Sequence, residues 1–328
     1  MATIIKAGRK SAVLTPSSLP CLSAIPTVNL TAGCLHGCLY CYARGYRQFP
    51  GDNKVVVYEN TLDMLRDELA RRRTKPQAVY FSPSSDLFQP APEILELGEA
   101  IIRFLLSKGI GVAFVSKGYI PDHVLGLLSD HAELVRAQVG IITLDESIAR
   151  TFEPNAARLE RRLAQIEALV RAGVPTEALI DPILPTVTDS PEATGRLFAA
   201  LADIGVKRAA ADMLFLRPAI VQSLRRGVPD KQMLARLLGA FPRPSPTGAS
   251  AGRACSQKLP LEVRRETFAL MRDAAAAHGI EVSVCACENP DLAGGICNIT
   301  GRWPKPSPPT VQFPLLPEED LAQEGRSS

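Results

Sequence analysis

Apolar residues in the first 240 positions follow two alternating patterns, short continuous runs and helical spacing. Six short runs lack strict polar alternation, as expected of parallel strands that are covered on both faces. They span residues 26–30, 78–82, 111–116, 137–143, 177–182 and 208–214. Between the runs, apolar residues recur every three or four positions, which is typical of amphipathic helices. The main groups are Leu62/Leu65/Leu69, Ile94/Leu97/Ile101/Leu105, Leu159/Leu163/Ile166/Leu169 and Leu197/Leu201/Ile204.

This order predicts an α/β fold built from parallel βα units with right-handed crossovers. An open doubly wound sheet and a partial or complete βα barrel both fit it, and in either one function gathers where the strands end. Distinctive polar segments follow five predicted strands in turn: 34–41, 84–86, 116–117, 143–145 and 182–185. We therefore expect these segments to meet at one rim. The aspartates near strand ends fit acid/base work or, more commonly, helix N-caps; they are Asp86, Asp145, Asp181 and Asp212.

The sequence changes character after residue 240. Residues 242–253 are rich in Pro, Ser and Gly, which indicates a loop or linker. An amphipathic helix at 261–278 and a short strand at 279–284 are expected beyond it, and the Pro-rich end is expected to be extended or disordered. We predict four parts: an N-terminal extension 1–24, a core 25–240, a cysteine-containing region 241–303 and a tail 304–328.

Composition narrows the class of protein without naming a partner. The net charge of the 328 residues is +3, which neither requires nor excludes nucleic acid. The arginine runs 71–73, 161–162 and 225–226 predict basic helix faces in water. No apolar stretch is long enough for a membrane span, so we expect a cytoplasmic protein without a membrane partner. Eight cysteines in a reducing compartment favour metal binding over disulfides.

Three of these cysteines, Cys34, Cys38 and Cys41, lie within eight residues directly after the first predicted strand. Gly33 and Gly37 permit the sharp turns that would point three thiols at one centre. Thiolates are soft ligands, so the expected occupant is zinc or an iron–sulfur cluster. Structural zinc needs a fourth ligand, and the loop would have to contort for His36 to supply it. Three cysteines on a cubane instead leave one iron open to bind another molecule.

The spacing Cys-x3-Cys-x2-Cys, with Tyr40 before the last cysteine, resembles the signature of the radical S-adenosylmethionine (SAM) superfamily. The resemblance implies a partial (βα)6 TIM-like barrel with a 4Fe–4S cluster on Cys34, Cys38 and Cys41. It also implies that the open iron chelates SAM, that an electron from the cluster cleaves the C5′–S bond, and that the resulting radical abstracts hydrogen from a substrate. Tyr40 would lie near the adenine. An external electron donor such as flavodoxin or ferredoxin would be a partner.

Longer segments, at 30–44, 81–90, 114–117 and 143–189, are similar to the spore photoproduct lyase family within that superfamily. The tracts Phe152-Glu153-Pro154, Arg161-Arg162-Leu163 and 181–189 carry much of this similarity. The resemblance implies that Lys117 pairs with the SAM carboxylate. It places Ser84, Ser85 and Thr143 at the amino and ribose groups, and Pro182 and Ile183 at the adenine. The alternative for Lys117 is a solvated charge at a strand end.

Two departures set this chain apart from that family. The stretch 82–86 has no sulfur, although the lyases carry a hydrogen-donating cysteine there. Tyr58 matches one catalytic tyrosine of the family's radical-relay pair, but its partner position holds Val56. The initiating chemistry therefore carries over better than thymine-dimer repair. The substrate is unidentified, with nucleic acid and peptide as the two classes.

Four further cysteines are C-terminal: Cys255, Cys285, Cys287 and Cys297. They favour a second 4Fe–4S cluster or a zinc ion, against a reading as small core residues. One of them would alternatively serve as the missing hydrogen donor. Cys21 stands alone and is expected to be structural. Two other functions stay open at this point: a radical SAM enzyme that modifies peptides with an auxiliary cluster, and a non-enzymatic zinc or iron–sulfur binding module.

Overall fold

The computed structural model describes residues 2–16, 22, 25–242, 256–285, 289–294, 299 and 303–304. Several predictions from the sequence fall outside these residues. They concern most of the linker at 242–253, nearly all of the tail after 304, and the cysteines Cys21, Cys255, Cys287 and Cys297.

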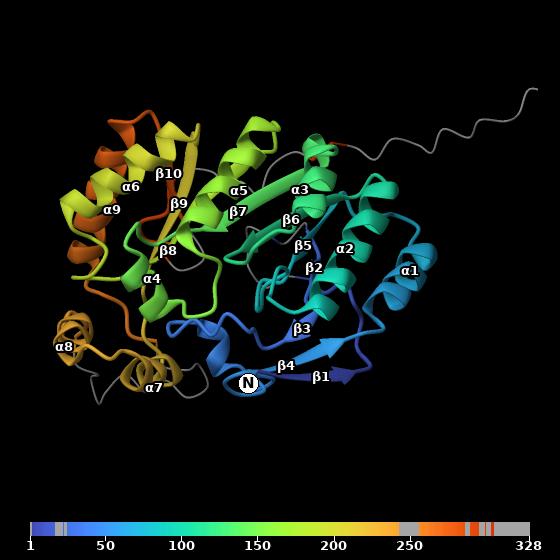
Figure 1. Cartoon of the computed structure of the whole chain (residues 1–328), viewed down its shortest axis with the longest axis horizontal. Helices are drawn as coiled ribbons and strands as arrows, with labels where there is room; N and C mark the ends of the chain where they lie inside the picture. Colours follow the sequence, from blue (N-terminus) through green and yellow to red (C-terminus); the bar gives the residue numbers. More distant parts are fainter. Residues whose placement is uncertain are drawn as a thin grey trace, which may run out of the picture.

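A parallel sheet of seven strands forms the centre of the described structure, in the order β10-β9-β8-β7-β6-β5-β2 (Figure 1). The strands are β2 (Thr27–Val28), β5 (Ala78–Phe81), β6 (Gly111–Ser116), β7 (Val135–Gly140), β8 (Thr176–Ile183), β9 (Arg208–Met213) and β10 (Glu281–Val284). Spatial order follows chain order without the reversal that a doubly wound sheet requires. Among the described residues, β2 and β10 are the edge strands, and no strand pairing joins them. The predicted α/β fold with a parallel sheet is confirmed in this open form.

Helices connect the successive strands of this sheet along the chain (Figure 1). Five lie where the sequence predicts helices: α1 (Thr61–Arg71), α2 (Pro92–Ser107), α5 (Leu159–Arg171), α6 (Pro191–Asp203) and α9 (Leu261–Ala276). Four were not predicted: α3 (Asp122–Ser129), α4 (Glu146–Phe152), α7 (Pro218–Gly227) and α8 (Lys231–Gly239). Asp145 caps α4 by accepting from the backbone N–H of Ser147 at 2.8 Å, as its position after a strand indicated.

The apolar sides of strands and helices meet in one main core. Phe81 and Phe114, on neighbouring strands, have no solvent exposure, nor has Ile101 of α2. Parallel strands read as continuous apolar runs because both of their faces are buried in this way. The C-terminal part 261–284 joins the same unit, since β10 pairs with β9 and α9 packs against α6. No helix of the described residues is both long and apolar enough to cross a membrane.

A second sheet, absent from the sequence prediction, lies beside the rim and has the order β1-β4-β3 (Figure 1). Its strands are β1 (Thr3–Ala7), β4 (Lys54–Tyr58) and β3 (Thr31–Ala32). The predicted strand 26–30 therefore ends early, at Val28, and the chain continues into β3 of the other sheet. Because β3 is followed at once by Gly33 and Cys34, this small sheet fixes where the cysteine loop begins.

Candidate active site

The thiols of Cys34, Cys38 and Cys41 are half-buried in one loop between β3 and the 3-10 helix η2 (Tyr42–Gly45). Gly33 has a φ of +83°, and a Cβ there would lie 2.6 Å from the carbonyl oxygen of Lys54. Both the left-handed backbone and the close approach therefore require glycine. The loop is shaped by its own sequence and by its contact with β4.

Hydrogen bonds hold this loop from two sides. The backbone N–H of Leu39 donates to the carbonyl of Phe152 at 2.8 Å, and the amide of Asn155 donates to the carbonyl of Leu35 at 3.0 Å. From the other side, the backbone N–H of Leu35 donates to the buried side chain of Gln89 at 2.8 Å. The segment after α4 and the segment after β5 thus fix the position of the cysteines in the apo chain.

Asp86 ties the same loop to two strand ends. Its Oδ2 lies 3.2 Å from Nε2 of the buried His36, which stands between Cys34 and Cys38. It also accepts from the Ser116 hydroxyl and from the Lys117 backbone N–H, each at 2.8 Å. Burial acts to raise the pKa of Asp86, but the neighbouring His36 and the backbone N–H groups of Lys117 and Phe88 lower it by more, so the net pKa is lowered. Asp86 is therefore suited to hold the loop as an anion.

A buried charge cluster lies behind the cysteine loop. Glu153 and Arg162 are each 1% exposed, with Arg162 Nη1 at 2.6 Å from Glu153 Oε2. Tyr40 donates its hydroxyl hydrogen to Glu153 Oε1. The Lys117 ammonium lies 3.9 Å from Glu153 Oε1 and donates to the backbone carbonyl of Asp181 at 2.9 Å. Two cations thus share the buried Glu153 carboxylate. Asp181 also interacts with Lys117, but burial raises the pKa of its carboxyl and favours the neutral form, so positive charge exceeds negative charge in this cluster.

One prediction from the sequence is wrong here, and the alternative reading of Lys117 is excluded. The arginine run 161–162 was expected to be solvated, but Arg162 points inward and also donates to the Gly140 carbonyl at 2.9 Å. Its charge is tolerated because Glu153 is buried beside it. Nor is Lys117 a solvated strand-end charge, since its side chain is only 14% exposed. Glu153 and Arg162 were not singled out as site residues, although the tracts that carried the family similarity contain both.

The residues predicted to bind SAM lie at the ends of consecutive strands. The Ser84 hydroxyl donates to Asn29 Oδ1 at 2.9 Å, whereas the buried Ser85 hydroxyl has no hydrogen-bond partner among the described atoms. Thr143 accepts from the backbone N–H of Asp145 at 3.0 Å. Pro182 and Ile183 are buried at the end of β8.

Contacts of Lys117 and Tyr42 link the predicted SAM-binding segments to the cysteine loop. Lys117 contacts Tyr40, Glu153 and the carbonyl that precedes Pro182, with its ammonium 5.7 Å from the Tyr40 ring centre. The Tyr42 hydroxyl donates to the Pro83 carbonyl and so joins the cysteine loop to the segment of Ser84 and Ser85. Lys117 and Tyr40 are therefore in contact beside the cysteine loop, and the two serines follow a residue that the loop contacts, whereas Thr143 and Ile183 are placed by their strands alone.

Tyr58 and Cys285 lie at opposite edges of this arrangement. Tyr58 ends β4, and its ring lies under the Arg9 guanidinium at 4.4 Å. Cys285 follows β10, half-buried, with its backbone N–H 3.4 Å from the Ala211 carbonyl. Burial, the neighbouring Asp181 and Cys285 raise the pKa of Asp212 at the end of β9. Cys285 thus reaches the same rim as the cysteine loop, while its three proposed partners lie outside the described residues.

The donor set fits an iron–sulfur cluster with an anionic ligand beside it. Burial raises the pKa of the Cys34 and Cys38 thiols, so a metal must bind for them to be thiolates. Lys117 and Arg162 supply positive charge for those thiolates and for a carboxylate, and the unpartnered Ser85 hydroxyl offers a further contact. Within the described residues, no three His, Cys, Asp or Glu side chains are grouped for a single metal ion. A cubane differs because each thiolate binds a separate iron.

Comparisons with known proteins agree with this fit. Residues 28–198, just over half of the chain, match the family model of the radical SAM superfamily. An uncharacterized protein of Mycobacterium tuberculosis is 30% identical over 213 residues, which cover 61% of this chain and 63% of that protein. A radical SAM Nα-GlyT isomerase of Pseudomonas phage M6 is 27% identical over 188 residues, covering 57% of this chain and 38% of the isomerase. The match therefore spans less than two thirds of either relative.

Two solved structures share the fold. Spore photoproduct lyase superposes with a TM-score of 0.66 at 18% identity, covering 86% of this chain and 82% of the lyase. A radical SAM methyltransferase from Sphaerobacter thermophilus superposes with a TM-score of 0.51 at 14% identity, covering 80% of this chain and 66% of that one. One structure of the lyase contains bound SAM together with a dinucleoside spore photoproduct. At these identities the likeness concerns the fold alone.

Proposed function

The chain belongs to the radical SAM superfamily, and from that premise we propose that Cys34, Cys38 and Cys41 bind a 4Fe–4S cluster that cleaves SAM reductively. The observation that carries the proposal is the cysteine loop itself. Its backbone is held by hydrogen bonds to two other segments, and Lys117 and Arg162 share the buried Glu153 carboxylate next to it. That combination suits a thiolate-bound cluster with a carboxylate ligand.

When bound, the cluster supplies one electron that breaks the C5′–S bond of SAM, releasing methionine and a 5′-deoxyadenosyl radical that takes hydrogen from the substrate. The chain's own residues bind and orient. We assign Lys117 to the SAM carboxylate and Ser85 to its amino group, because the first has surplus charge and the second lacks a partner. Tyr40, fixed by its hydrogen bond to Glu153, would form a wall of the adenine pocket beside Pro182 and Ile183.

For the substrate we propose hydrogen abstraction from a molecule other than the thymine dimer. The segment Ser82–Asp86 carries no sulfur that would return a hydrogen atom, and Tyr58 lies in the small sheet under Arg9. Cys285, which directly follows β10, would replace the missing cysteine as hydrogen donor, or would instead bind a second cluster. An acidic electron carrier such as flavodoxin or ferredoxin would supply the electron.

Anaerobic reconstitution with iron and sulfide tests this function directly. We expect a brown protein with about four irons per chain, or about eight if the C-terminal cysteines hold a second cluster. With dithionite and SAM it should release 5′-deoxyadenosine and methionine in equal amounts, measured by liquid chromatography. A colourless protein that binds zinc and leaves SAM intact would overturn the proposal in favour of a metal-binding module.

Replacing Lys117 with methionine should weaken SAM binding more than it slows cleavage. The change keeps the length of the side chain but removes a charge-assisted contact of about 1.5–3 kcal/mol, or roughly 10- to 100-fold in affinity. We expect the KM for SAM to rise by about that factor, with iron content unchanged. Lys108→Met, the same change at the exposed end of α2, is the matched control and should leave KM as it is. An unchanged KM in Lys117→Met protein would remove Lys117 from the SAM pocket.

A further inference from the structure

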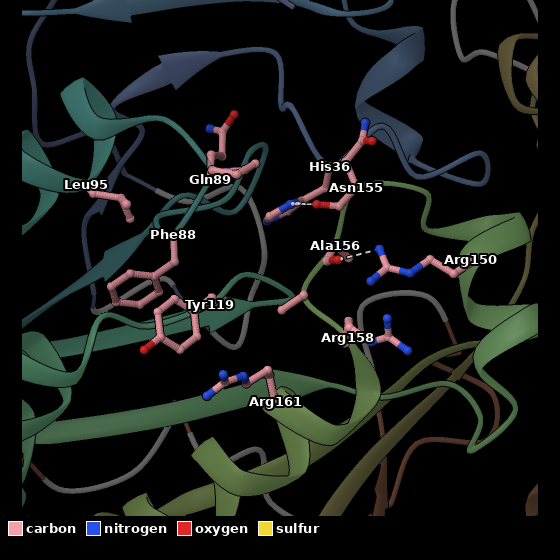
Figure 2. Close-up of a pocket in the computed structure, with 12 residues that line it drawn as sticks. His36, Phe88, Gln89, Leu95, Tyr119, Arg150, Asn155, Ala156, Arg158 and Arg161 are labelled. Atoms are coloured by element: carbon pink, nitrogen blue, oxygen red, sulfur yellow. Dashed lines mark hydrogen bonds between the residues drawn. The ribbon is translucent and has the colours of Figure 1, made fainter.

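A cavity of about 480 Å³ lies beside the cysteine loop, which contributes His36 to its lining (Figure 2). The lining comes from the loop itself, from the segments after β5 and β6, and from α4 through the start of α5. Among the lining residues are His36, Phe88, Tyr119, Arg150, Arg158 and Arg161. None of the residues predicted to bind SAM lines it. The cavity is therefore a separate feature of the same loop.

A single residue of the cysteine loop, His36, lines this cavity. It stands directly between two predicted cluster ligands, Cys34 and Cys38. Its ring Nδ1 lies 3.2 Å from the Asn155 carbonyl, a contact drawn in Figure 2, and Nε2 faces Asp86. A molecule seated in the cavity thus contacts the loop that would hold the cluster, without entering the SAM pocket.

The surface around the cavity has an apolar centre and a basic margin. Phe88, Pro90, Leu95 and Tyr119 contribute to the centre. At the margin, Glu146 pairs with both Arg150 at 3.0 Å and Arg158 at 3.7 Å, so one carboxylate faces two guanidinium groups. Arg161 lies over the Tyr119 ring at 5.8 Å. Tyr119 is 39% exposed. Arginine and tyrosine around an apolar centre form the composition typical of a protein interface.

We propose that this cavity is the docking site of an acidic one-electron carrier protein of the flavodoxin type. The inference rests on the proposed function, because only a chain with a redox cluster needs such a partner. The apolar centre suits the flat, exposed edge of a flavin, and the arginines suit the acidic surface around it. One electron passes from the reduced carrier to the oxidised cluster, so the carrier is oxidised by one electron and no bond or proton is transferred. Electron-transfer contacts are small and transient, so they do not need an extended apolar surface.

The test uses the reconstituted full-length enzyme and a double variant, Arg158→Gln with Arg161→Gln. Arg150 is left in place because it donates to the carbonyls of Pro154 and Ala156 and so shapes the wall. The matched control, Arg71→Gln with Arg72→Gln, removes the same charge from exposed positions at the end of α1. Each protein is assayed for 5′-deoxyadenosine with reduced flavodoxin and, separately, with dithionite, and the Kd for oxidised flavodoxin is measured by calorimetry.

We expect the double variant to lose about tenfold in the flavodoxin-driven rate and in flavodoxin affinity at low salt, with the dithionite-driven rate unchanged. Added salt should slow the wild type and the control more than the double variant, because the double variant has lost two of the three arginines whose attraction salt screens. Ferredoxin serves as a second probe, and a loss confined to ferredoxin would reassign the site to that carrier and overturn the flavin argument.

Three outcomes contradict the docking site. An unchanged flavodoxin Kd and rate would exclude the cavity, and an equal loss with dithionite would place the arginines in the SAM site or the fold instead. Tight binding of an oligonucleotide that the double variant loses, with flavodoxin binding intact, would assign the surface to a nucleic acid. If the wild type cleaves no SAM even with dithionite, the proposed function itself fails. The calorimetric Kd alone then decides whether flavodoxin binds at this cavity.

Discussion

Cys38→Ser protein, reconstituted anaerobically, is expected to lose its loop-bound cluster and with it all cleavage of SAM. A serine hydroxyl is a hard oxygen donor that stays protonated near neutral pH, so it replaces a soft thiolate poorly. Cys38 is the middle one of the three ligands, and two thiols cannot hold a cubane at three corners. Iron content should fall by about four per chain, and 5′-deoxyadenosine should drop to the background of the assay.

The fold should survive this substitution, which separates loss of the cluster from loss of structure. The loop is anchored by Leu39, Asn155 and Gln89 through bonds that do not involve sulfur. The apo forms of the variant and the wild type should therefore unfold within a few degrees of each other. Cys285→Ser is the control, and it should keep cleaving SAM whether or not it loses a second cluster. A brown Cys38→Ser protein that still cleaves SAM would contradict the assigned ligands.

The main sheet was predictable because its strands are continuous apolar runs and its helices long periodic segments. The strand Gly111–Ser116 agrees with the sequence prediction to the residue, and α5 contains the apolar group from Leu159 to Leu169 that predicted a helix. The small sheet was not predictable in the same way. Its central pairing joins β1 to β4 across some fifty residues, and β1 is largely exposed, so local periodicity carries no sign of it. The local sequence of β1 does not indicate that it pairs with a strand so far along the chain.

The proposed cluster loop could be predicted from spacing, because three cysteines within eight residues suit one shared centre. The buried ion pair behind it could not. An arginine beside another arginine on a helix is normally solvated, and only the position of Glu153 on the preceding segment makes burial of Arg162 tolerable. Cys285 is placed at the rim, whereas the second cluster stays a prediction because its other three ligands lie outside the described residues.

Arg162→Leu should destabilise the protein by about 3–5 kcal/mol, the usual effect of removing one partner of a buried ion pair. Glu153 would keep only the Lys117 ammonium, 3.9 Å away, as a countercharge. The Gly140 carbonyl would also lose its donor. The free energy of unfolding is measured by urea denaturation of the apo chain. Arg161→Leu, one position earlier on the same helix but exposed, is the matched control and should change stability by less than about 0.5 kcal/mol.

A second substitution at Glu153 shows whether charge or packing causes the loss. In the double variant Arg162→Leu with Glu153→Gln, the uncompensated carboxylate is gone, while the amide oxygen still accepts from Tyr40. Much of the lost stability should therefore return, because leaving one buried charge unpaired destabilises a protein more than removing both charges of the pair does. If the double variant is as unstable as Arg162→Leu, the arginine acts through packing alone. The positive surplus that we assign to the SAM carboxylate would then rest on Lys117 alone.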